Sequence, residues 1–125
     1  MLASNLLRVS VVIVLFGMVM GMAMGMAQDF RLMPAHAHLN LIGFVSLFLA
    51  GLYYQAVPQA AASTLATWQA WIAVIGAIVF PVGICIVLLN GPHYEIYPIA
   101  GSLVAFVGML LFAIIVFRHG ALQRA

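Results

Sequence analysis

The chain has 125 residues, of which 67% are hydrophobic and 5% are charged, and its formal net charge is +2. A soluble domain of this size needs far more polar surface, so the composition excludes a soluble globular protein and indicates an integral membrane protein. The few arginines are too scattered for a nucleic-acid-binding surface. The single cysteine, Cys85, has no partner for an internal disulfide.

Four apolar segments are each long enough to cross a bilayer, which takes about 20 apolar residues. They cover residues 6–27, 34–57, 65–89 and 92–117. The connections between them are short, and short connections make consecutive helices antiparallel neighbours. The sequence therefore predicts one domain over residues 1–125, an all-α integral membrane four-helix up-down bundle.

The arginines predict how this bundle is oriented. Arg8, Arg118 and Arg124 lie near the two termini, and positively charged residues favour the cytoplasmic side of a membrane. We therefore expect a multi-pass protein of the cell inner membrane with both termini in the cytoplasm. The connections that carry Arg31 and His93 then face outward.

Two histidines at the N-terminal end of the second apolar segment are the main candidates for functional residues. His36 and His38 lie in the run Pro34–Asn40, just before a long apolar stretch. Ligand-type side chains are costly within a membrane span and are functional by default. Residues two apart lie roughly 200° around a helix axis, so the two rings are expected to face opposite sides of one helix.

Neutral imidazole is a common ligand of iron, copper and zinc. Small neighbours such as Ala35, Ala37 and Gly43 leave room for a flat macrocycle between helices. Helical bundles hold heme in this way, and without a Cys-x-x-Cys-His motif the heme would be bound through its axial ligands only. We therefore expect heme b at His36 and His38. Interfacial histidines bonded to backbone or headgroups are the alternative.

Two further residues on the outer face are weaker candidates. His93 could be an additional ligand or a partner of a heme propionate, or it could simply face water. Arg31 could bind a propionate, because arginine pairs well with carboxylates, or it could pair with Asp29.

The first segment repeats glycine every four residues, at Gly17, Gly21 and Gly25. This spacing lets helices approach closely, so the segment is expected to form a packing interface. Its many methionines are expected to fill gaps, with thioether ligation of Cu(I) as the alternative. Tyr53 and Tyr54, with the two tryptophans Trp68 and Trp71, are expected to form an interfacial aromatic belt.

The stretch from His36 to Val45, continuing through Gly51–Tyr54 and Pro58, resembles the tenth helix of the catalytic subunit of heme–copper oxidases and nitric oxide reductases. The resemblance is closest to the C-family oxidases, whose His-x-His pair ligates two hemes on opposite helix faces. It implies that His36 corresponds to the high-spin ligand and His38 to the low-spin ligand.

The chain also departs from that family, because the family's catalytic subunit has twelve spans and a copper site built from three further histidines. A complete oxidase is therefore not expected. The resemblance implies that three copies could form a twelve-helix trimer, with the glycine-rich first segment at the interface and heme held between protomers.

The expected function is that of a b-type heme protein in electron transfer or diatomic-gas binding. Its expected partners are the lipid bilayer, further copies of the chain, and quinol or a soluble redox protein. Two alternatives stay open. One is a copper- or zinc-binding membrane protein that uses His36, His38, His93 and the methionines, and the other is a structural accessory subunit without a cofactor.

Overall fold

The computed structural model describes residues 1–120 and contains helices but no strand in that range. The helices are α1 (Leu2–Ala27), α2 (Met33–His38), η1 (Leu39–Ser46), α3 (Leu47–Ala56), α4 (Pro58–Ala61), α5 (Thr64–Asn90), η2 (Pro92–Tyr94) and α6 (Ile96–Gly120). Arg124, one of the arginines used to predict the orientation, lies outside the described residues.

Four continuous helical stretches are long and apolar enough to span a membrane. They are Leu2–Ala27, Met33–Ala56, Thr64–Asn90 and Pro92–Gly120. The prediction of an all-α protein is confirmed for the described residues, and so is that of four helices long and apolar enough to cross a membrane. The connection predicted between the second and third spans contains an additional short helix, α4.

Local sequence explains where the helices begin and end. Pro34 lies in the first turn of α2, where the N–H that proline lacks would have no partner within the helix. Ser63 caps α5, because its hydroxyl oxygen accepts a hydrogen bond from the Ala66 amide at 3.2 Å. Gly91 ends α5 with φ of 105°, a conformation that favours glycine.

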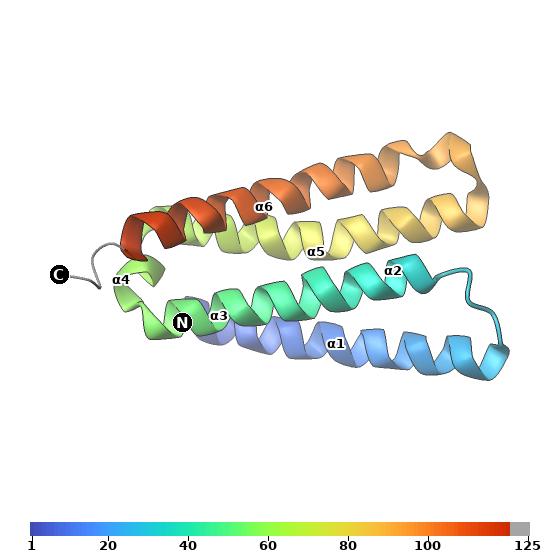
Figure 1. The fold of residues 1–125 in the computed structure, drawn as a ribbon, viewed down its shortest axis with the longest axis horizontal. Coiled ribbons are helices and arrows are strands. Elements are labelled where there is room, and N and C mark those ends of the chain that lie inside the picture. Colours follow the sequence, from blue (N-terminus) through green and yellow to red (C-terminus); the bar gives the residue numbers. More distant parts are fainter. Residues whose placement is uncertain (121–125) are drawn as a thin grey trace.

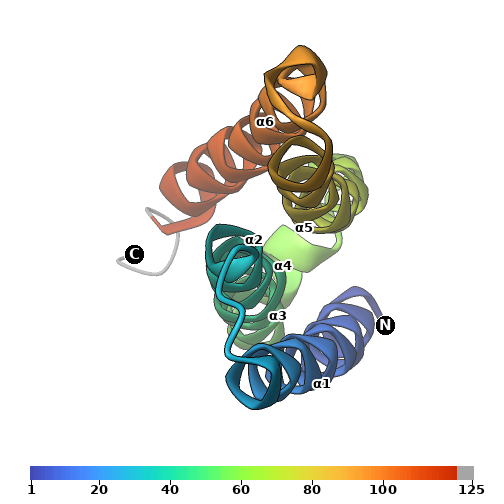
Figure 2. The same cartoon turned by 90° about the vertical axis from the view of Figure 1, so that its right-hand side faces the viewer.

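The four long helices form an open arc. In Figure 1 the α1–α2 connection and the α5–α6 connection lie at one end, while the N-terminus and α4 lie at the other. Figure 2 shows the helices in the order α1, α2 with α3, α5 and α6. The stretch α2–η1–α3 therefore has α1 on one side and α5 on the other, and both neighbours contact it.

Helices α5 and α6 pack backbone to backbone through glycines. A Cβ added at Gly76 would lie 2.7 Å from the Ala105 Cα, and one added at Gly101 would lie 2.6 Å from the Phe80 Cα. Backbone atoms cannot move aside as a flexible side chain can. These glycines therefore let the backbones of α5 and α6 approach closely, which is the role that small residues have in membrane bundles.

The remaining core contains a buried polar contact near the α4 end. The Tyr54 hydroxyl donates to the Gln69 Oε1 at 2.8 Å, and the Gln69 Nε2 donates to the Gly108 carbonyl at 3.4 Å. Tyr54 is only 1% exposed, so its assignment to an interfacial belt is wrong. Its ring packs at right angles to Phe112 instead. Trp68 and Trp71 do face outward, as predicted.

Candidate functional site

The two histidines of α2 face different neighbours. The Phe80 ring of α5 packs against the His38 ring, with centroids 4.8 Å apart and an interplanar angle of 69°. The His36 ring lies against α1, where a Cβ added at Gly21 would be 2.9 Å from its Cε1. The prediction that the rings face opposite sides of one helix is confirmed.

The His38 ring is held in a defined tautomer. Its Nδ1 lies 2.7 Å from the Pro34 carbonyl oxygen. A carbonyl can only accept, so Nδ1 carries the proton and donates, and the Nε2 of the neutral ring keeps its lone pair. Histidine ligands of metals are commonly oriented by this kind of Nδ1–H···O=C bond. The His38 ring is therefore already oriented to bind a metal through its Nε2.

The His36 ring lies in a different polar environment. Its Nε2 is 3.3 Å from the Asn40 Nδ2, which donates to it. Its Nδ1 is buried and has no hydrogen-bond partner among the described residues, and the same holds for the Asn40 Oδ1. Unpartnered buried polar atoms are rare in native proteins and call for an explanation, such as a bound group.

Glycines of α1 make room for this polar pair. A Cβ at Gly17 would collide with the Asn40 side chain, and one at Gly21 would press on His36. Nothing lies within 4 Å of a Cβ added at Gly25. The expectation that this glycine repeat forms an interface between protomers is therefore wrong for Gly17 and Gly21, because helices of the same chain already cover both positions.

A π-helix follows the histidine pair directly. It spans Leu39–Ser46, and Ser46 Oγ donates to the Leu41 carbonyl five residues earlier, at 3.1 Å. π-Helical turns are rare and often lie at functional sites. Asn40 lies in this segment and reaches back to His36. Sequence reasoning missed both the π-helix and Asn40, although the apolar surroundings of Asn40 are a signal that could have marked it.

Arg31 pairs with a neighbouring acid in the α1–α2 connection. Its Nη2 lies 2.7 Å from the Asp29 Oδ2, and its Nε donates to both carboxylate oxygens. These hydrogen bonds lower the pKa of the Asp29 carboxyl from its usual 3.8 and raise the pKa of Arg31. Of the two predicted roles of Arg31, the structure shows the pairing with Asp29.

His93 lies in η2, at the same end of the bundle as α2, and is exposed. Its side chain makes no hydrogen bond within residues 1–120. Across that range no three histidine, cysteine, aspartate or glutamate side chains come together as metal ligands. The structure thus brings His36, His38 and His93 to one end of the bundle without joining them in one cluster.

No family model matches the chain, and neither do the curated proteins or the solved structures.

Proposed function

We propose that this chain is a b-type heme-binding membrane protein that uses His36 and His38 as axial ligands on opposite faces of α2. Its role is electron transfer or the binding of a diatomic gas. The observation that supports this most strongly is the fixed tautomer of His38, whose Nδ1 donates to the Pro34 carbonyl and whose Nε2 keeps a lone pair.

The two histidines fit a heme to different degrees. His38 presents a free Nε2 as it stands, beside the apolar ring of Phe80. The His36 Nε2 accepts a hydrogen bond from the Asn40 amide, so the buried Nδ1 of the neutral ring carries the proton. A metal can therefore bind His36 only after Asn40 is displaced from Nε2 or the ring changes its tautomer. His38 is the principal ligand in this proposal, and His36 is the ligand that requires local rearrangement.

The residues of the chain orient the rings. The Pro34 carbonyl fixes the His38 ring, which packs on Phe80 of α5, and the His36 ring lies against Gly21 of α1. Heme b, when bound, supplies a one-electron couple and, where an axial position stays open, a site for a diatomic gas. Arg31 is held by Asp29 and is at most a secondary contact for a propionate.

Orientation and assembly are also part of the proposal. Arg8 and Arg118 lie near the chain ends, which supports cytoplasmic termini, an up-down path across the inner membrane and histidines near the outer surface. There they could exchange electrons with quinol or a soluble redox protein. The open arc of Figure 2 leaves α1 and α6 at its two ends, which suits a homotrimer of twelve helices.

The test is an optical spectrum of protein purified from cells supplied with ample heme, recorded oxidised and after dithionite reduction. The proposal predicts sharp α and Soret bands of b-type heme on reduction. His119→Ala is the matched control, because His119 lies near the end of α6, where its Nδ1 donates to the Ile115 carbonyl. A featureless visible spectrum of folded protein would refute the proposal.

A structural accessory subunit is the second candidate, and the contact of His36 with Asn40 and Gly21 favours it. In that case His36→Ala lowers the stability of the protein and changes no spectrum. The copper or zinc alternative has less support, because no three-ligand cluster is present within residues 1–120.

A further inference from the structure

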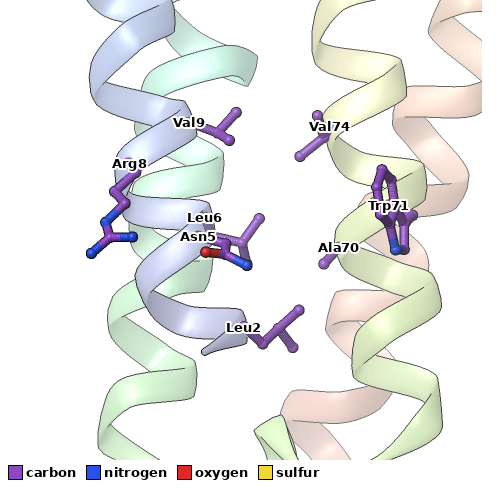
Figure 3. Close-up of a pocket in the computed structure, with 8 residues that line it drawn as sticks. All are labelled: Leu2, Asn5, Leu6, Arg8, Val9, Ala70, Trp71 and Val74. Carbon is purple, nitrogen blue, oxygen red and sulfur yellow. The ribbon is translucent and has the colours of Figure 1, made fainter.

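Helices α1 and α5 flank an apolar groove. At the N-terminal end of α1 the groove has a volume of about 340 Å³. Figure 3 shows Leu2, Leu6 and Val9 of α1 pointing toward α5, where Ala70 and Val74 line the opposite wall. This part of the groove is lined mainly by apolar side chains and lies near the N-terminal end of α1.

The groove continues toward the middle of the bundle as a second cavity of about 620 Å³. Arg8 and Val9 line both parts, and Phe16, Leu39 and Ile78 line the deeper one. The deeper walls are almost entirely apolar. The two parts together form an elongated apolar channel whose outer end lies beside polar groups.

Three polar groups lie at that outer end. The Asn5 amide points toward α5, while the Arg8 side chain extends toward the N-terminal end of α1 on the side of that helix away from α5 (Figure 3). Trp71 of α5 is 65% exposed. Long arginine side chains direct their charge to the membrane surface in this way, and tryptophan prefers the same depth.

Within residues 1–120, Arg8 has no counter-charge nearby. The chain has two acidic side chains, Asp29 and Glu95, and both are in connections at the opposite end of the bundle. The ion pair between Arg31 and Asp29 is the only one within the described part of the chain. A cation at the surface end of an apolar groove is therefore open to an anionic group from outside the protein.

We propose that this groove binds one anionic phospholipid. The acyl chain lies between α1 and α5, and the phosphate lies at the outer end near Arg8, Asn5 and the indole N–H of Trp71. Only an amphiphile matches an apolar channel that ends at a cation. A neutral quinone would fill the channel but leave the charge of Arg8 without a partner.

The experiment is native mass spectrometry of the purified protein after incubation with equimolar phosphatidylglycerol and phosphatidylcholine that carry identical acyl chains. Wild-type protein is expected to retain several-fold more phosphatidylglycerol. Arg8→Gln should abolish this preference, and Arg8→Lys should keep it. Arg118→Gln is the matched control, because Arg118 is exposed at the same end but does not line the groove.

Val74→Trp provides a second variant, since it fills the groove without changing charge. It should reduce retention of both lipids. Equal retention of the two lipids by wild-type protein would overturn the proposal. So would equal losses in Arg8→Gln and Arg118→Gln, or recovery of a neutral quinone in place of phospholipid.

Discussion

The bundle contains two buried polar sites that differ in how completely they are satisfied. Near α4, Tyr54 donates to Gln69, and Gln69 donates on to the Gly108 carbonyl, so these two side chains find their partners within the protein, although the hydroxyl of the neighbouring Tyr53 is buried without one among residues 1–120. Near the other end, His36 and Asn40 share one hydrogen bond, and each keeps one buried atom without a partner among the same residues.

We infer from this difference that the Tyr54–Gln69 contact is structural and that the His36–Asn40 site is suited to bind a ligand. In an apolar surrounding, a satisfied polar contact joins helices, whereas an unsatisfied atom costs free energy until something binds it. Tyr54 and Gln69 therefore hold α3, α5 and α6 together. His36 and Asn40, with the pre-oriented ring of His38 beside them, are placed for a group that the chain itself does not supply.

The largest effect is expected from Tyr54→Phe. It leaves the buried Gln69 Oε1 without its donor and should cost about 1–3 kcal/mol of unfolding free energy. Replacing both partners, with Gln69→Leu as the second change, should cost less than the sum of the two single changes. Unfolding in mixed detergent, followed by circular dichroism, measures these free energies. If the double variant lost the sum of the two single losses, the result would contradict a direct interaction between Tyr54 and Gln69.

Gly21→Ala should have the next largest effect. The new methyl group presses on the His36 ring, and overpacking of this kind costs about 1 kcal/mol or more. Gly25→Ala is the matched control on the same helix, since its Cβ meets nothing within 4 Å. The same unfolding assay compares the two, and equal stability of both variants would show that Gly21 does not make room for His36.

Asn40→Leu should change the stability of the heme-free protein by less than about 1 kcal/mol in either direction. The exchange removes a buried unpaired oxygen while it also removes a weak hydrogen bond to His36. A loss as large as that of Tyr54→Phe would mean that the two polar sites are equivalent.

The smallest effect on stability is expected at the Asp29–Arg31 pair. This pair is exposed to solvent, so it can be compared with the two buried polar sites. Arg31 lowers the pKa of Asp29 in the folded protein, so the pair stabilises the fold above the usual pKa of 3.8 and loses that effect as pH falls through the lowered value. Arg31→Gln should return the pKa of Asp29 toward 3.8. An NMR titration of the Asp29 carboxyl tests this, and an unchanged pKa would contradict the pairing.

The sequence predicted the four spans and the opposite faces of His36 and His38 because both follow from apolar run length and helical geometry. The partners of polar side chains could not be predicted. The aromatic character of Tyr54 pointed to the interface, and only the packing of three helices shows its contact with Gln69. The glycine repeat of α1 likewise indicated close packing without revealing that the neighbours are His36 and Asn40.

The most direct test of the central claim is the heme content per chain, measured by pyridine hemochrome in wild-type protein, His38→Ala and His93→Ala. His38 has a fixed tautomer and lies against Phe80 of the neighbouring helix α5, and together these make it the principal ligand, whereas His93 is exposed in η2. The account predicts b-type heme in the wild type, a loss of most of it in His38→Ala, and near-normal content in His93→Ala. Full heme content in His38→Ala would contradict the assignment of this histidine as the principal ligand.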